Sequence, residues 1–342
     1  MGCECDNHSK DLDLDTSKIP PNELQIASLS LPEEEKIDSS SFPYELSHLI
    51  KSKLNTTSQT PIKFMPITEE EFNSIQERNT YAPEIIKNYA SQLDEIEYEN
   101  DIQYKDIPPI KVIDPNGGSQ YYHGGFNRKG QCHGKGIWIK DYDIYLGNFR
   151  NDQFFGKGLY ISEHGEYYFG EWKNSMYDGV GNLTIDKKLS YNGNFKRGKK
   201  DGFGEETYPD GDTYKGGFYN GEKNGRGQYV FNDGTRYEGN FKNNKYNGFG
   251  QICLKEGESI RGYFKDGKLN GEGDVNYKDG TKFIGNFVDD KKSGQGVFVG
   301  KDGEIYKGMW DDNVLSGSNV VIRWNNDIIF NNDKICMNYV IK

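Results

Sequence analysis

Residues 214–236, YKGGFYNGEKNGRGQYVFNDGTR, form a 23-residue unit that decides the fold. In its first five residues, Tyr, Gly and Phe alternate with other residues, so these three side chains share one face of a strand. The Gly-x-Gly motif at 225–227 opens a second strand, and the Asp-Gly pair at 233–234 predicts a turn into the next unit. The unit is therefore a β-hairpin in which glycine leaves room for neighbouring rings to lie across the backbone.

The unit recurs nine times at steps of 23 residues, without an insertion between first positions. These first positions are Tyr122, Tyr145, Tyr168, Tyr191, Tyr214, Tyr237, Ile260, Phe283 and Tyr306. The third position is always Gly and the fifth is always aromatic. A lone hairpin is marginal in water, so the repeats must pair with their neighbours in a one-dimensional stack. The period predicts a mostly β fold, an elongated single-layer antiparallel sheet of nine repeats.

Tyr-x-Gly-x-Phe followed by Gly-x-Gly at this period resembles the MORN (membrane occupation and recognition nexus) repeat, over about residues 122–328. The departures are local, because Ile260 and Phe283 replace Tyr, and Asn319 replaces Gly in the last copy. MORN arrays occur in membrane tethers, ciliary components and cytoskeletal scaffolds, and as appendages to enzymes. The resemblance therefore implies an elongated β-solenoid that binds partner proteins or lies near membranes.

The composition changes sharply near residue 121. Only 3 of the 42 glycines precede it, and residues 1–121 carry 10 Lys and Arg against 23 Asp and Glu, a net charge of −13. The remainder carries 32 against 30, a net charge of +2. We expect an acidic, largely disordered tail over 1–66, short helices and a linker that cap the repeats over 67–121, the nine repeats over 122–328 and a C-terminal cap over 329–342.

Two short helices are predicted between the tail and the repeats. The capping-box pattern at 68–71 opens the first helix, which should run to about Arg78. Pro83 suits the first position of the second helix, whose apolar residues recur at helical spacing at Ile85, Ile86, Tyr89, Leu93 and Ile96. This stripe either packs on the first hairpins as an N-terminal cap or binds a partner.

The N-terminus, Met1-Gly2-Cys3-Glu4-Cys5, resembles the N-termini of dually acylated membrane-associated kinases. Gly2 is the candidate for myristoylation, and Cys3 and Cys5 are the candidates for palmitoylation. Two acyl chains give stable anchoring, whereas one gives marginal attachment. Asp6 stands where Ser or Thr is favoured, so the alternative is an unmodified acidic tail. Cys3, Cys5 and His8 lack a fourth ligand nearby, and no metal site is expected.

Several functional classes are not expected. The residues after each Gly-x-Gly continue as a strand, whereas a phosphate-binding loop needs a helix there. The five histidines show no spacing suited to a metal or a catalytic triad, so we expect no enzyme activity, no catalytic residue and no cofactor. The near-neutral repeats argue against nucleic acid as a partner. No stretch approaches 18 consecutive apolar residues, so no membrane-spanning helix is expected.

The favoured function is a non-enzymatic scaffold or tether that presents the repeats to partner proteins at the cytoplasmic face of a membrane. One alternative is a structural component of a cilium, an axoneme or the cortical cytoskeleton. Another is direct phospholipid binding, which the net charge of +2 favours least.

Candidate partner contacts are the fifth-position aromatics, since such rings are common interface anchors. They are Phe126, Phe149, Trp172, Phe195, Phe218, Phe241, Phe264, Phe287 and Trp310. The alternative is packing within the sheet, which we expect for most of these rings. An exposed final strand also favours a homodimer that forms through the C-terminal repeats.

Overall fold

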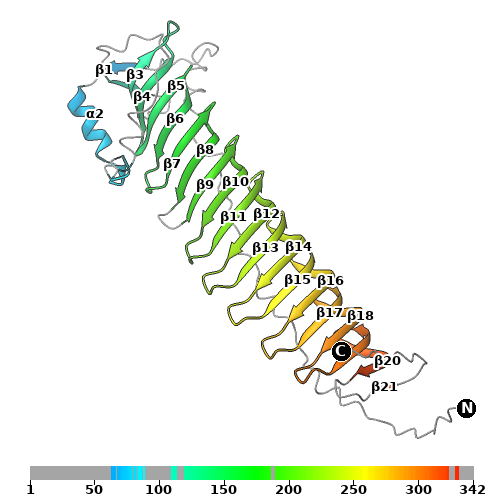
Figure 1. Ribbon diagram of the computed structural model, residues 1–342. Helices are drawn as coiled ribbons and strands as arrows, with labels where there is room; N and C mark the ends of the chain where they lie inside the picture. The colour runs from blue at the N-terminus through cyan, green and yellow to red at the C-terminus, as the bar shows by residue number, and fades with distance from the viewer. Residues whose placement is uncertain are drawn as a thin grey trace, which may run out of the picture. The chain divides into compact units, whose positions relative to one another are not determined.

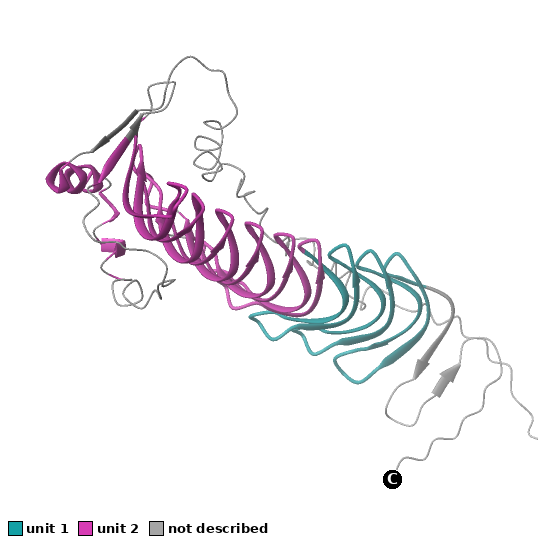
Figure 2. Cartoon of the chain, turned by 90° about the horizontal axis from the view of Figure 1, so that it is seen from above, with its two compact units in different colours: residues 1–31, 245–342 teal, residues 32–244 magenta. Residues whose placement is uncertain are grey.

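A computed structural model describes residues 63–66, 68–78, 80–82, 84–86, 88, 109–113, 119–185, 189–322 and 328–330. The described elements fall into two compact units, coloured separately in Figure 2. Unit 2 lies within residues 32–244, and the described part of unit 1 lies within 245–342. Each unit is one antiparallel sheet in which the strands follow one another in chain order (Figure 1).

Among its described residues, unit 2 has one helix and thirteen strands with defined bounds. They are β1 (Lys63–Pro66), α2 (Glu69–Gln76), β2 (Ile110–Ile113), β3 (Ser119–Phe126), β4 (Cys132–Lys140), β5 (Asp143–Arg150), β6 (Gln153–Ile161), β7 (Tyr167–Lys173), β8 (Met176–Ile185), β9 (Leu189–Lys196), β10 (Lys199–Thr207), β11 (Thr213–Tyr219), β12 (Glu222–Val230) and β13 (Arg236–Lys242).

The described part of unit 1 contains strands only. They are β14 (Lys245–Cys253), β15 (Ser259–Lys265), β16 (Lys268–Asn276), β17 (Lys282–Val288), β18 (Lys291–Val299), β19 (Ile305–Asp311), β20 (Val314–Ile322) and β21 (Ile328–Phe330). The prediction of a mostly β, antiparallel array of hairpins is confirmed.

The glycines of the repeat form a row that crosses the strands. Gly147 lies opposite Gly158, and Gly158 lies opposite Gly170 on the next strand. The Tyr145 ring covers this row, and a Cβ atom added at Gly147 or Gly158 would overlap its hydroxyl group. The Tyr145 hydroxyl donates a hydrogen bond to the Asn148 carbonyl (2.9 Å). Glycine is therefore required because the ring lies directly on the backbone.

Rings of successive repeats interlock on this buried face. Tyr145 makes edge-to-face contacts with Phe149 of its own repeat (5.2 Å between centroids) and with Trp172 of the next (5.3 Å). Tyr168 repeats both contacts with Trp172 (5.1 Å) and Phe195 (5.2 Å). Such contacts stabilise aromatic pairs beyond the burial of their area. Ring contacts therefore link each repeat to the next one.

The short turns between strands add hydrogen bonds between repeats. Asp289 and Asp290 both have positive φ (48° and 71°), as a type I′ hairpin turn requires. The Asp290 backbone N–H donates to the Leu269 carbonyl (2.9 Å), and the Asp290 carboxylate accepts from the Leu269 N–H (2.6 Å). Asn313 makes the same pair of bonds with Lys292. Each such turn therefore fixes the start of the preceding hairpin's second strand.

The helix α2 covers part of unit 2. Its N-cap residue, Thr68, accepts a hydrogen bond from the Glu71 N–H (3.1 Å), which confirms the predicted capping interaction. Phe72 and Ile75 of α2, together with Ala82 and Ile85, share one buried cluster with sheet residues. The sheet residues of this cluster are Tyr121, Ile139, Ile144, Leu159 and Ile161. The stripe residues Tyr89, Leu93 and Ile96 lie outside the described residues.

Two strands occur where none was expected. β1 lies within the segment predicted to be a disordered tail, and β2 lies within the predicted linker. β1 pairs with β2, and β2 pairs with β3, so both extend the sheet beyond the first repeat. These four-residue strands lack the repeat motif, and their sequences alone gave no periodic signal. Pairing with an existing edge stabilises them.

Candidate interaction surface

The fifth-position rings do not form an open surface. Eight of the nine are buried, and Phe126 is half-buried. The buried eight are Phe149, Trp172, Phe195, Phe218, Phe241, Phe264, Phe287 and Trp310. They share the face of the first-position Tyr and pack against it, as the contacts of Tyr145 and Tyr168 show. Because these eight rings are buried, they are not direct contacts for a partner. Any partner must bind other residues.

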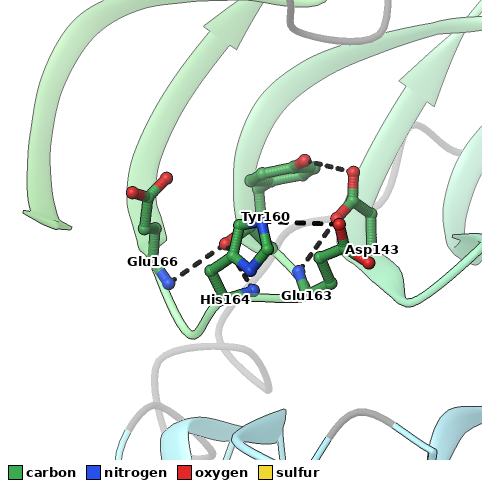
Figure 3. Close-up of polar contacts among 6 residues, drawn as sticks. Asp143, Tyr160, Glu163, His164 and Glu166 are labelled. Carbon is green, nitrogen blue, oxygen red and sulfur yellow. Dashed lines mark hydrogen bonds and ion pairs between the residues drawn. The ribbon is translucent and has the colours of Figure 1, made fainter. Parts of the chain in front are cut away.

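A polar cluster at the β5–β6 end of unit 2 resembles a reactive site but is structural (Figure 3). The Asp143 carboxylate accepts hydrogen bonds from the Tyr160 hydroxyl (2.6 Å) and the Glu163 N–H (3.0 Å). Burial raises the pKa of the Asp143 carboxyl. Three repeats later, Asp212 accepts the same two bonds, from the Tyr229 hydroxyl (2.6 Å) and the Asn232 N–H (2.8 Å). Recurrence in a second repeat shows that this carboxylate fastens a loop.

Three lysines are buried at one repeat position that elsewhere holds an apolar or aromatic side chain. Lys200 forms an ion pair with Glu206, whose other carboxylate oxygen accepts from the Tyr208 hydroxyl. Lys223 lies over three tyrosine rings, at 5.1 to 5.8 Å from their centroids. The sequence analysis missed these residues, because each lysine lies in a polar stretch beside a predicted turn.

Lys292 is the third buried lysine, and it has no carboxylate partner. Its Nζ lies 5.3 to 5.5 Å from the centroids of four rings, those of Tyr277, Phe283, Phe298 and Trp310. None of the described residues accepts a hydrogen bond from this Nζ. Burial lowers the pKa of the Lys292 ammonium group to about 8. The rings attract the cation, but they do not replace its lost hydration.

The opposite face of each sheet, which we call the outer face, carries the exposed rings. On β14 and β15 of unit 1, Phe249 and Tyr263 lie directly opposite each other, with ring centroids 5.4 Å apart. They are 42% and 51% exposed, and the Arg261 guanidinium lies 5.3 Å from the Phe249 centroid. Aromatic residues and arginine are the residues most enriched at interface centres. The sequence contains a signal for this cluster, because an aromatic residue occupies two outer-face positions that lie on adjacent strands.

The other predicted site residues, Gly2, Cys3 and Cys5, lie outside the described residues. Among the described residues, no group of three or more His, Cys, Asp or Glu side chains could hold a metal ion. No helix in the described part of the chain is long and apolar enough to cross a bilayer.

Comparison with known proteins identifies the repeat. The MORN repeat family matches residues 145–165, 168–186, 191–213, 214–236, 237–257, 261–282 and 283–305. These are seven of the nine copies in the sequence, and the first and last copies fall outside the match. No curated protein matches the chain significantly.

Solved structures give a weaker likeness. The TCP domain of SAS-4 (dCPAP) from Drosophila melanogaster, in complex with a proline-rich motif of Ana2 (dSTIL), covers 46% of this chain and 86% of its own, at 11% identity and a TM-score of 0.30. The TCP10 domain of Danio rerio CPAP (E1021V mutant) covers 58% of this chain and 92% of its own, at 18% identity and a TM-score of 0.31. TM-scores this low do not support a conclusion about function. The family match and the hairpin geometry agree with each other, and residues 145–305 of this chain are MORN repeats.

Proposed function

We propose that this chain is a non-enzymatic scaffold that binds partner proteins through the outer face of its MORN repeats. The observation that carries the proposal is the exposed cluster of Phe249, Tyr263 and Arg261. Rings packed edge to face on a rigid sheet lose little conformational entropy when a partner covers them. The near-neutral charge of the repeat region, 32 Lys and Arg against 30 Asp and Glu from residue 122 onward, favours a protein over a nucleic acid.

Substitution of the two rings tests this proposal. In a Phe249→Ser/Tyr263→Ser variant, removal of both anchors should weaken partner binding by roughly tenfold or more. The measurement is quantitative affinity purification of the tagged full chain from cells, with reversible cross-linking. At least one protein that co-purifies with the wild type should be lost.

Phe203→Ser is the matched control for the ring substitutions. Phe203 occupies the same repeat position as Phe249 and is 54% exposed, but it lies opposite Gly217 and not opposite a ring. This variant should retain the partners. If the double variant and the control retain the same proteins as the wild type, the ring cluster is not a binding site.

The second part of the proposal is that acylation of Gly2, with Cys3 and Cys5, holds this scaffold at the cytoplasmic face of a membrane. The support is the sequence Met1-Gly2-Cys3-Glu4-Cys5, which offers two acylation signals side by side. Gly2→Ala should move the chain from the membrane fraction to the soluble fraction of a cell lysate. A Ser9→Ala variant, altered nearby but outside the acceptor residues, should remain with the membranes. Equal membrane retention of Gly2→Ala and wild type would exclude the anchor.

A further inference from the structure

The outer face carries two apolar blocks that occupy the same positions six repeats apart. On β5, β6 and β7 of unit 2, the first block contains Leu146, Leu159, Ile161 and Tyr167. The residues 138 positions later (six times 23) are Ile284, Val297, Val299 and Ile305, on β17, β18 and β19 of unit 1. We call these four residues the unit 1 block. Cross-strand pairing joins them, because Ile284 lies opposite Val297 and Val299 lies opposite Ile305.

The repeat fold does not itself require apolar residues at these positions. In the four repeats that begin at Tyr191, Tyr214, Tyr237 and Ile260, the outer-face position of Leu146 and Ile284 holds a polar or charged side chain. These residues are Asn192, Lys215, Glu238 and Arg261, whereas the half-buried Phe169 adjoins the first block. Since these repeats form the same hairpins, the unit 1 block needs a reason other than folding.

The first block shows what covers such a surface in this protein. Leu159 and Ile161 are fully buried, and Phe72 and Ile75 of α2 belong to the same cluster. Leu146 and Tyr167 pack against that cluster. The occupant is a short amphipathic helical segment with acidic residues in its first turn, Glu69, Glu70 and Glu71.

The unit 1 block has no such cover among the described residues. The described part of unit 1 contains strands only, and Ile284 is 48% exposed. Both edges of β18 are paired, to β17 and β19, so an added strand cannot dock there. A helix that lies across the face remains as the fitting occupant, as α2 does in unit 2.

Charges around the unit 1 block indicate the kind of helix that fits. Lys282 and Lys307 lie opposite Val299 and Val297, at two opposite corners of the block. The corresponding residues of the first block are Ile144 and Phe169, so the two positive charges are particular to unit 1. One carboxylate, Asp274, lies opposite Ile284 on the neighbouring strand β16. The two lysines favour acidic residues on the flanks of the bound helix.

We propose that the unit 1 block docks an amphipathic helix of a partner protein, with an apolar stripe toward Ile284, Val297, Val299 and Ile305 and acidic residues toward Lys282 and Lys307. This inference rests on the proposed scaffold function and names one partner class for it. The block is distinct from the Phe249–Tyr263 cluster, so the two sites can fail independently.

The probe is a fluorescent peptide with the sequence of residues 68–88, which is acidic and contains Phe72, Ile75, Ala82 and Ile85. Fluorescence anisotropy with the full chain should show saturable binding that weakens with added salt. Ile284→Asp should weaken binding by about tenfold or more, because it places a charge in the apolar contact. Lys282→Glu/Lys307→Glu, at the corners of the block, should weaken binding and remove its salt dependence.

Asn192→Asp is the matched control, since Asn192 occupies the position of Ile284 four repeats earlier and is exposed. This variant and Phe249→Ser/Tyr263→Ser should bind the peptide as the wild type does. The proposal is overturned if the peptide does not bind, or binds equally to Ile284→Asp and to the lysine variant. It is also overturned if binding appears only after deletion of residues 331–342, or if the chain self-associates through Ile284, because the occupant is then its own tail or a second copy.

Discussion

At the scale of single residues, Lys292 is a side chain whose burial costs stability. Its ammonium group is fully buried among four rings, without a carboxylate beside it. The folded-state pKa of about 8 lies below the ordinary value of 10.5, so the folded state disfavours the charged form. The energetic cost is fully present below pH 8 and is relieved as the pH rises from 8 to 10.5.

Lys292→Met should therefore stabilise unit 1 at pH 7. The gain is at most on the order of 3 kcal/mol, because burial disfavours the charged form and the lost cation–π attraction offsets part of the gain. The gain should shrink between pH 8 and 10. Urea unfolding followed by tryptophan fluorescence measures both effects. Lys200→Met, at the same repeat position, should destabilise instead, since it leaves the buried Glu206 carboxylate without its ion-pair partner.

The same residues show what the sequence could predict at this scale. The alternation of Tyr, Gly and an aromatic residue predicted which side chains share a face, and Tyr145 over Gly147 and Gly158 confirms the reason for glycine. The burial of Lys292 could not be predicted. The same repeat position holds the buried Tyr246 and Leu269 in other copies. A lysine beside a turn is nevertheless expected to be exposed, because its burial depends on how the sheet packs around it.

At the scale of secondary-structure elements, the hairpin turns hold neighbouring hairpins together. The Asp290 carboxylate accepts the Leu269 N–H while its backbone adopts a φ of 71°. Asp290→Ala removes this acceptor and places Ala in an unfavourable conformation, so it should destabilise unit 1 by about 1–3 kcal/mol. Asp290→Asn should retain most of the stability, because Asn244 and Asn313 make the equivalent bond. Thermal unfolding of the two variants distinguishes them, and equal losses would contradict the role of the side chain.

The elements with strong local signals were predictable, and those that depend on an edge were not. The Asp-Gly pair at 233–234 and the capping box at Thr68 each specify their geometry within a few residues, and both occur as predicted. β1 and β2 are strands because β3 offers them an unpaired edge. The fifth-position rings illustrate a third case. Packing within the sheet was expected for most of them, and their burial shows which rings are unable to contact a partner.

At the scale of the whole molecule, the stability of each sheet is shared between adjacent strands. In unit 2, β7 pairs only with β6 and β8, and the ring and turn contacts of each repeat also reach only the next one. Stability in such a stack is close to a sum of repeat and neighbour terms. Loss of a distant repeat should therefore leave the remaining hairpins intact, whereas loss of an adjacent strand should expose an edge.

A chain that ends after residue 281 tests this directly, because it lacks β17 to β21 and leaves β16 as the last strand. Hydrogen exchange should show unchanged protection of the amides of β5 to β9, since all their partners lie within unit 2. Protection should fall in β16, which loses its pairing with β17. Gly285→Ala in the full chain is the matched perturbation, because a Cβ there would meet the Gly296 backbone at 2.7 Å and loosen β17 without removing it. A uniform loss of protection in β5 to β9 under either change would mean that the repeats fold as one cooperative body and not as a chain of neighbours.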